Sequence, residues 1–333
     1  MAPLRAVDSN GNGMKLYLPS FFILLFCATG SFAQNFEVSV TETFRPQNKK
    51  ILLLKNAGDG QKKIILFQTN LRVNTDGSPK SYHPQDLRGN AKALNNICNA
   101  IVIRRKATGE NLCLTNFKEA IGIFEKFRDS GYQTVPPGIQ VIWENVLAKV
   151  TQNGRDTPCI FTSGEFKGYF GSLTALKNGL IGSEKGECEV NNQVDPLRVP
   201  ALVLVGGKNP VRDFGAQVGD LLFAYNPANQ LFSAAIIGDT GPKDNLGEGS
   251  VFLNMKLLGK TTPPANKTET FKFSVSSSQV LIAIIPGSHS FRVVTPYTAE
   301  NINQRVTDWQ KESGFDTPEK FIDFLKSSTP QLK

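Results

Sequence analysis

The sequence has few of the residues that hold metals. It contains only two histidines, His83 and His289, and they lie far apart in the chain. Its five cysteines include no CxxC pair, whereas zinc sites combine such pairs with histidines at short spacing. The sequence therefore excludes the common zinc motifs, and we expect neither a metal nor another cofactor.

Clusters of positive charge are also lacking, although the chain is basic. It has 37 lysines and arginines against 29 acidic residues, a formal net charge of +8. Such a balance can attract an anionic partner, for example nucleic acid or a cell-wall polymer. The basic residues are scattered in short groups such as Lys62-Lys63, and no nucleic-acid-binding motif accompanies them. We therefore expect a generally basic surface and no nucleic-acid partner.

Only one long apolar run occurs, and it lies near the N-terminus. Residues 16–27 follow Met14-Lys15 and precede a stretch of mostly small residues that ends at Ala33. This pattern is typical of a secretory signal peptide and is too short for a membrane span. We assign residues 1–33 to a signal peptide cleaved near Ala33, with Met14 as an alternative start. A lipoprotein anchor at Cys27 is the competing interpretation, but Phe26 is bulky where a lipobox has a small residue.

No later stretch is apolar enough to cross a membrane, so we expect a secreted or periplasmic protein without stable membrane insertion. The four cysteines that remain after processing favour disulfides in such a compartment. Cys98 and Cys113 lie on two strand-like runs that flank the turn at residues 106–110, so a hairpin would pair them. Cys159 would then pair with Cys188.

Short strands dominate the pattern along the chain. Ile51–Lys55 and Lys63–Gln68 flank the turn signal Ala57–Gly60, and Ala100–Arg105 is predicted to pair with Asn111–Leu114. Five further runs are predicted to be strands: Ala201–Val205, Asp220–Tyr225, Phe232–Ile237, Phe271–Val275 and Val280–Ile285.

Four segments are predicted to be helical. They are Asn116–Ser130, with Asn116 and Glu119 as a capping box, Ser250–Leu258, Ala299–Lys311, and a last helix capped by Thr317 with Pro318 at its first position. Many short strands with a few helices predict a mainly β fold, a β-rich α+β single domain with a β-barrel-like core.

Two acidic residues lie among glycines after an apolar run. Asp239 directly follows the strand-like residues 231–237 and Gly238, and Glu248 lies nine positions later, with two glycines between the two acids. Paired carboxylates in different environments can divide the roles of acid and base, as in most glycosidases. The alternative is a solvated loop in which Asp239 caps a turn and Glu248 caps the next helix.

Four blocks of the sequence resemble, in the same order, those of the fungal-type chitosanases of glycoside hydrolase family 75: Gly168–Leu176, Gly219–Leu221, Ala235–Pro242 and Gly247–Ser250. The resemblance covers roughly residues 74–287. It implies hydrolysis of β-1,4 links in chitosan with inversion, by one Asp and one Glu, and places these roles on Asp239 and Glu248. We divide the mature chain into a family-like catalytic domain over residues 34–298 and a helical C-terminal extension over residues 299–333.

The turn-and-strand layout around Asp239 is similar to the active-site corner of double-psi β-barrel hydrolases, so we expect a six-stranded barrel of that kind with peripheral helices. Within the pair we make Glu248 the acid, because a carboxyl in a closing loop can be shielded and its pKa raised, and Asp239 the base.

Five residues are candidates for substrate contacts. Asp76 and Asp213 could make the cleft locally acidic, and Tyr169 could stack on a sugar ring. Ser172 and Thr174 belong to the first block of the resemblance. The alternatives are that Asp76 is a turn residue in an Asp-Gly pair and that Tyr169 belongs to the core.

The charge of the chain separates two function classes. Chitosan is a polycation that a basic protein repels at long range, and residues 69–74 contain no acidic residue where the family commonly shows several. We expect a monomeric, secreted glycosidase acting on a chitosan-like polysaccharide. The alternative is an exported polysaccharide-binding or envelope-associated module of the same fold without turnover.

Overall fold

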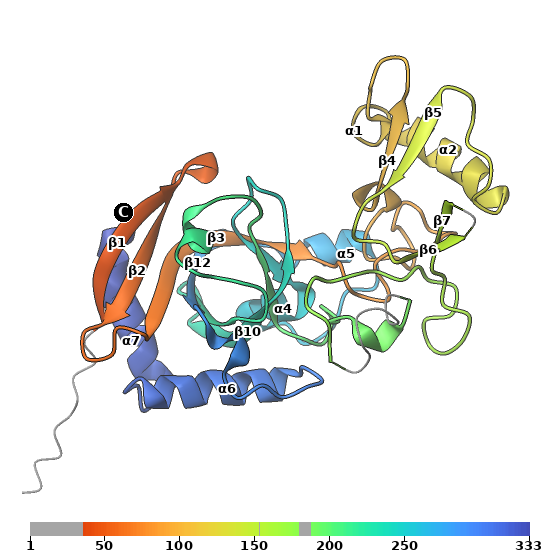
Figure 1. The fold of residues 1–333 in the computed structure, drawn as a ribbon. Helices are drawn as coiled ribbons and strands as arrows, with labels where there is room; N and C mark the ends of the chain where they lie inside the picture. Colours follow the sequence, from red (N-terminus) through yellow and green to blue (C-terminus); the bar gives the residue numbers. More distant parts are fainter. Residues whose placement is uncertain (1–35, 153, 180–187) are drawn as a thin grey trace, which may run out of the picture. The chain divides into compact units, whose positions relative to one another are not determined.

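Apolar side chains alternate between two faces of β3 (Lys63–Asn74), the longest strand in the computed structural model. Ile64 and Leu66 contribute to one buried core, and Ile65 and Phe67 contribute to another. Successive side chains of a strand point to opposite faces, so this pattern buries both sides of β3. The structure describes residues 36–333 except 153 and 180–187 (Figure 1). The predicted signal peptide lies outside the described residues.

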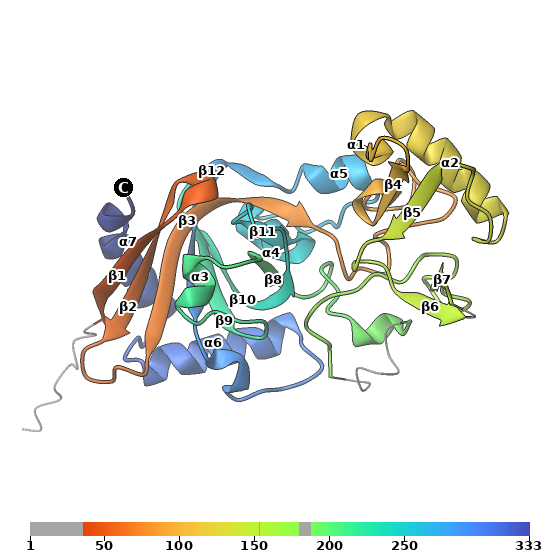
Figure 2. The ribbon, with the colours of Figure 1, turned by 45° about the horizontal axis from the view of Figure 1, so that its top comes forward.

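Six strands close into a barrel in the order β3-β11-β8-β10-β9-β12 and back to β3 (Figure 2). The other five strands of the barrel are β8 (Ala201–Leu204), β9 (Leu221–Asn226), β10 (Leu231–Thr240), β11 (Glu248–Ser250) and β12 (Val275–Ile285). The pairs β3–β11 and β8–β10 are parallel, and the other pairs are antiparallel. The prediction of a mainly β fold with a six-stranded barrel core and peripheral helices is confirmed.

Two further strands extend the sheet beyond β3. β1 (Phe36–Phe44) pairs with β2 (Lys49–Asn56), and β2 pairs with β3, both antiparallel. The predicted turn at residues 57–60 joins β2 to β3, with Lys55 opposite Lys63. This hairpin is therefore confirmed.

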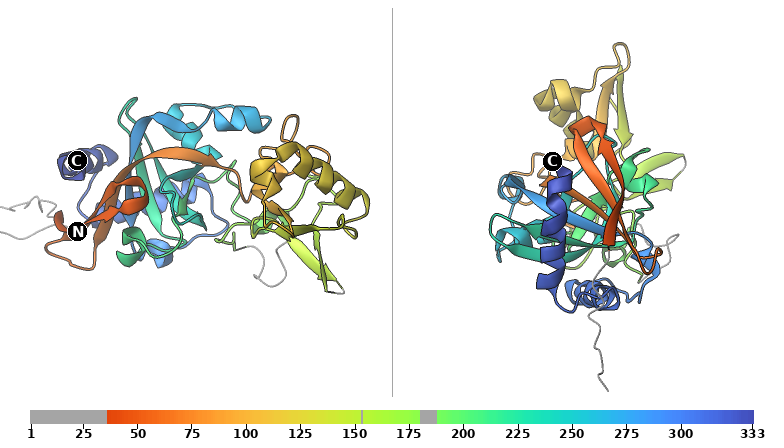
Figure 3. Two further views of the ribbon diagram at one scale, coloured as in Figure 1. Left: turned by 90° about the horizontal axis from the view of Figure 1, so that it is seen from above. Right: turned by 90° about the vertical axis from the view of Figure 1, so that its left-hand side faces the viewer.

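The C-terminal helices pack on the outer strands. α6 (Ala299–Glu312) lies against β9 and β10, and α7 (Pro318–Ser328) runs beside β1 and β2 (Figure 3). Trp309, Phe315 and Phe321 belong to the same core as Phe36 and Phe223. Residues 299–333 therefore complete one face of the sheet, and residues 34–333 form one compact unit.

The helix caps follow the local sequence. The side chain of Thr317 accepts a hydrogen bond from the backbone N–H of Lys320 at the start of α7. Ser250 does the same for Leu253 at the start of α4 (Val251–Leu258). Each bond satisfies an N–H that the helix itself leaves free, which is why these helices begin where they were predicted.

A third core lies in the segment between β3 and β8. It contains α2 (Phe117–Asp129), whose buried face includes Ile121, Phe124 and Phe127. The other elements here are α1 (Leu112–Thr115), β4 (Ile101–Arg105), β5 (Ile139–Trp143), β6 (Lys149–Gln152) and β7 (Arg155–Pro158). Asn116 caps α2 by accepting from the N–H of Glu119, as predicted.

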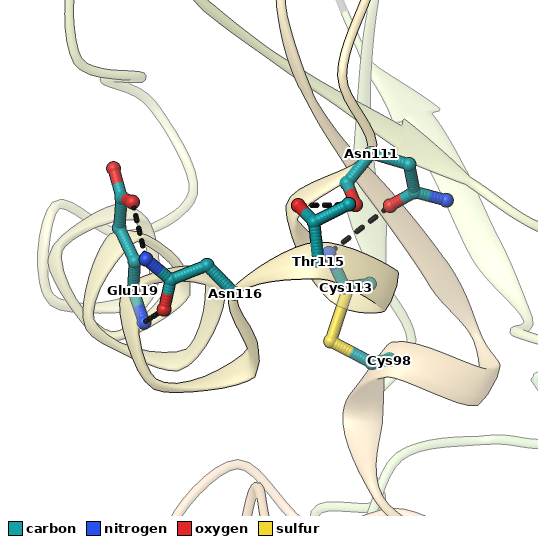
Figure 4. The surroundings of a disulfide bond; sticks show 6 residues. All are labelled: Cys98, Asn111, Cys113, Thr115, Asn116 and Glu119. Carbon is teal, nitrogen blue, oxygen red and sulfur yellow. Dashed lines mark hydrogen bonds between the residues drawn. A yellow bond between two sulfur atoms is a disulfide. The ribbon is translucent and has the colours of Figure 1, made fainter.

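The predicted partner of β4 is wrong. β4 pairs with β5 along its whole length, from Ile101 opposite Trp143 onward, and only an isolated bridge joins Arg104 to Asn111. Residues 112–115 form α1 instead, because the side chain of Asn111 accepts from the N–H of Cys113 at 3.0 Å and begins a helical turn (Figure 4).

Both predicted disulfide pairings are confirmed. Cys98 pairs with Cys113 and Cys159 with Cys188, with Cα–Cα distances of 5.3 and 5.5 Å. Figure 4 shows the first bond joining the start of α1 to the residues before β4. The pairing of Cys98 with Cys113 thus needs only the turn of α1, not the predicted hairpin.

The predicted strand at Phe271–Val275 is also wrong. Residues 267–271 form α5 (Lys267–Phe271), because the side chain of Asn266 accepts from the N–H of Glu269. β12 begins at Val275 and continues through the predicted strand 280–285. A last short helix, α3 (Pro210–Asp213), follows β8. In the described part of the chain, no helix has the length and apolarity needed to cross a membrane.

Candidate active site

Asp239 and Glu248 project from the barrel on either side of one strand. Asp239 of β10 and Glu248 of β11 are both in register with Val203 of β8, which lies between them. Side chains in register on neighbouring strands point to the same face of a sheet. Two strand spacings place the two Cα atoms about 9–10 Å apart. A register shift directly before Asp239 marks a bulge, a feature that bends a strand and turns a side chain.

Both carboxylates line one cleft of about 1300 Å³. Asp76, which follows the end of β3, lines the same cleft. The lining also includes one further acidic residue, Glu144, and three basic residues: Arg72, Lys149 and Lys177. The cleft therefore combines three neighbouring carboxyl groups with walls of mixed charge.

Asp239 is held by two backbone amides. Its Oδ1 accepts from the N–H of Ala175 at 3.0 Å and from the N–H of Thr240 at 2.8 Å. Burial raises the pKa of Asp239 to about 6, and the nearby charge of Glu248 adds to this rise. The two amide bonds and the charge of Lys177 act in the opposite direction. Asp239 can therefore carry a proton in mildly acidic solution.

Glu248 is oriented by a side-chain relay. The amide of Asn245 donates to Oε1 of Glu248 at 2.6 Å, and the amide of Gln47 donates to Oδ1 of Asn245 at 3.1 Å. Gln47 also accepts from the N–H of Leu246 at 3.0 Å, so it is anchored to the same loop. Nothing in the sequence near Gln47 indicates this contact, whereas Asn245 is recognisable as a polar residue three positions before Glu248.

Two glycines let the loop between Asp239 and Glu248 pack on the strands. Gly247 has a φ of +115°, and a Cβ there would lie 2.2 Å from the carbonyl oxygen of Asn70. At Gly241 a Cβ would lie 2.7 Å from Val203 and 3.4 Å from Oε2 of Glu248. Any larger residue at position 247 would push the loop away, and one at 241 would crowd the carboxylate.

Asp76 is the third carboxyl group of the cleft. The hydroxyl of Tyr82 donates to Oδ1 of Asp76 at 2.5 Å, and the amide of Asn99 donates to the Tyr82 oxygen at 2.7 Å. Burial raises the pKa of Asp76 to about 7, and the charges of Asp239 and Glu248 add to it, whereas the Tyr82 bond lowers it. The three carboxyl groups are thus close enough to influence one another electrostatically.

The other candidate substrate contacts lie in different places. Thr174 lines the cleft, but its hydroxyl donates to the carbonyl of Leu176 and accepts from the N–H of Val194. Ser172 is buried and accepts from the N–H of Gly77, so it fixes the turn that carries Asp76.

Ser172 and the two remaining candidates, Tyr169 and Asp213, are not among the described residues that line the cleft. Tyr169 packs edge-on against His83, with ring centroids 4.7 Å apart. Asp213 is exposed at the end of α3. The structure therefore brings Asp76 and Thr174 to the carboxylate pair, but not Tyr169, Ser172 or Asp213.

The cleft also contains residues that the sequence did not single out. Phe271, at the end of α5, is 51% exposed and lines the cleft. Arg72 of β3 is in register with Glu248 on the side away from Val203. The Asn266–Glu269 spacing of an N-terminal helix cap could have indicated that Phe271 lies in a helix, but not that it lies at the cleft.

No group of three or more His, Cys, Asp or Glu side chains in the described ranges is arranged to hold a metal ion. Comparison with models of known protein families finds no match for this chain, and comparison with curated protein sequences finds no significant match.

Proposed function

We propose that the protein is a secreted glycoside hydrolase that cleaves β-1,4 links in chitosan or a related amino-sugar polymer with inversion. The observation that carries this proposal is the position of Asp239 and Glu248 on one face, two strands apart, in one cleft. Inverting glycosidases need two carboxyl groups about 6.5–9.5 Å apart, so that a water fits between the base and the sugar. Side chains from Cα atoms about 9–10 Å apart can reach that separation.

The environments of the two carboxyl groups favour Asp239 as the acid. A general acid must hold its proton until it protonates the leaving oxygen, and burial gives Asp239 a pKa of about 6. Glu248, oriented by Asn245, then acts as the base that activates water. This reverses the roles expected from the sequence, because burial raises the pKa of Asp239, the residue expected to be the base.

The size and lining of the cleft suit a polysaccharide. A volume of about 1300 Å³ exceeds the 300–1,000 Å³ typical of small-molecule sites. Phe271 offers an exposed ring on which the apolar face of a pyranose can pack. The amides of Asn99 and Asn145 line the cleft and can form hydrogen bonds with sugar hydroxyls.

Release of reducing ends from chitosan oligomers tests the proposal. The purified protein should release them, and Asp239→Asn should reduce the rate about 10²–10⁴-fold. Asp213→Asn is the matched control, because it removes the same charge at an exposed position outside the cleft lining. The control should keep the full rate.

The second candidate is a polysaccharide-binding module of the same fold. The basic net charge and the three basic residues of the cleft disfavour a cationic polymer, and so favour a module that binds another polysaccharide without turnover. Retention of glycan binding with no reducing ends released from any amino-sugar polymer would replace the hydrolase proposal with this one.

A further inference from the structure

The charges along the cleft do not match a polycation. Three basic residues, Arg72, Lys149 and Lys177, line it beside the three carboxyl groups of the site, and Glu144 is the one other acidic residue among the described lining residues. A polymer with an ammonium group on every sugar needs carboxylates along the whole path of the chain. The described lining instead contains both positive and negative groups.

Arg72 places one of these positive charges close to the sugar on which the proposed reaction occurs. Arg72 on β3 is in register with Glu248 on the parallel strand β11, about 4.8 Å away between Cα atoms. Its side chain is exposed, and none of the ion pairs found among the described residues involves it. Lys149, by contrast, is paired with Asp156 at 2.7 Å. A guanidinium with free donors beside the site can pair with a carboxylate in two parallel hydrogen bonds.

We propose that the cleft selects amino-sugar glycans with acylated amines and carboxylate substituents over glycans with free ammonium groups, and that Arg72 pairs with the sugar carboxylate next to Glu248. This inference narrows the substrate class of the proposed hydrolase and rests on the same cleft. Burial supports it, since it raises the pKa of both Asp76 and Asp239 and so removes negative charge at the mildly acidic pH where chitosan is most highly charged.

Phe271 completes the recognition surface. It lines the cleft on the side of β3, where the hydroxyl of Ser274 accepts from the N–H of Val73 and ties the residues after α5 to this strand. A sugar ring packed on Phe271 therefore lies along the same wall as Arg72. The ring supplies affinity that is independent of charge, and Arg72 supplies selectivity by charge.

Binding to three polymers tests the inference. Asp239→Asn serves as the background, so that binding can be measured by calorimetry without cleavage. The probes are chitosan with free amines, soluble β-1,4 oligomers of N-acetylglucosamine, and the alternating polymer of N-acetylglucosamine and glucuronate. We expect the carboxylated polymer to bind most tightly and chitosan to bind at least about tenfold more weakly than it.

The variant Arg72→Gln should weaken binding of the carboxylated polymer about tenfold and leave the uncharged oligomers unaffected. Arg45→Gln is the control, because Arg45 is exposed outside the cleft lining and its loss changes the net charge equally. Arg72→Lys keeps the charge and should retain part of the affinity. Equal effects of Arg72→Gln and Arg45→Gln, or chitosan binding as tightly as the carboxylated polymer, would overturn the inference.

Reducing-end release from the same three polymers by the unsubstituted protein separates this inference from the proposed function. Cleavage of chitosan in preference to the acylated polymers would support the hydrolase proposal and contradict the proposed charge selectivity. The expected order of binding without any cleavage would support the proposed charge selectivity and contradict the hydrolase proposal.

Discussion

The side-chain amide of Asn245 donates a 2.6 Å hydrogen bond to the carboxylate of Glu248, three residues further along the same loop. Gln47, from the segment between β1 and β2, holds Asn245 in turn. Glu248 is thus oriented by a part of the chain remote in sequence, which also anchors the loop through Leu246.

Removal of this contact should slow the reaction without preventing substrate binding. We expect Asn245→Ala to lower kcat about tenfold with little change in KM, because the base loses its orientation rather than its charge. Asp244→Ala, at the exposed neighbouring position, is the control and should leave both constants unchanged. A rise in KM alone would assign Asn245 to substrate binding instead.

Rescue by azide tests which of the two carboxyl groups is the acid and which is the base. An external anion can take the place of the base and attack the sugar, so azide should restore activity to Glu248→Ala but not to Asp239→Ala. The measurement is product formation with and without azide, together with the anomeric form of the product. Restoration in Asp239→Ala alone would return the acid role to Glu248.

The rate should depend on the proton of Asp239. Because its pKa is raised to about 6, kcat/KM should fall as the pH rises through about 6, where the acid loses its proton. A pH–rate profile from pH 4 to 9 checks this. A flat rate between pH 5 and 8 would contradict the assignment of Asp239 as the acid.

Asp76 should make the folded protein less stable as the pH rises. Its folded-state pKa of about 7 lies above its ordinary value of 3.8, so the folded chain binds this proton more tightly than the unfolded chain does. The stabilisation is fully present below about pH 4 and is lost as the pH rises through about 7, by on the order of 4 kcal/mol.

Asp76→Asn should remove this dependence. Urea unfolding at pH 8 should then give a higher free energy of unfolding for Asp76→Asn than for the unsubstituted protein, and at pH 4 the two values should be similar. A difference of the same size at both pH values would mean that the charge of Asp76 is not responsible.

The disulfide between Cys98 and Cys113 should stabilise the folded chain. It joins residues 15 apart in sequence, and a loop of that length corresponds to about 3 kcal/mol. The double variant Cys98→Ser, Cys113→Ser should lose about that much in urea unfolding under non-reducing conditions. An unchanged midpoint and slope would show that α1 holds these residues together without the bond.

Much of the barrel was predictable because its strands bury both faces. Runs such as residues 64–67 and 234–237 are apolar at consecutive positions within the predicted strands. The carboxylate pair was predictable because Asp239 lies near the end of an apolar strand and Glu248 follows the glycine-containing turn after it. Caps at Ser250 and Thr317 depend only on neighbouring residues, and they occur as predicted.

The wrong predictions concern segments whose structure depends on contacts with residues distant in sequence. Nothing near Ile101 indicates that Trp143 will lie opposite it. The sequence pattern instead favours pairing with the nearer segment at residues 111–114. The side chain of Asn111 accepts from the N–H of Cys113 and begins a helical turn, which the strand-like pattern of this segment does not indicate. Arg72 and Phe271 reach the cleft, and Gln47 reaches Asn245, only through the closed barrel, which the sequence of each segment does not encode by itself.

Closure of the barrel has a consequence for the order in which this protein can fold. Ile65 of β3 pairs with Ile284 of β12, and most of the chain lies between them. A ribosome delivers β3 long before β12, so the edge of β3 that faces β12 stays unpaired while the intervening residues are made. Exposed strand edges promote aggregation, and such distant pairings form slowly. The nascent chain must therefore be shielded until β12 has emerged, and the barrel forms only after almost the whole polypeptide has been synthesised.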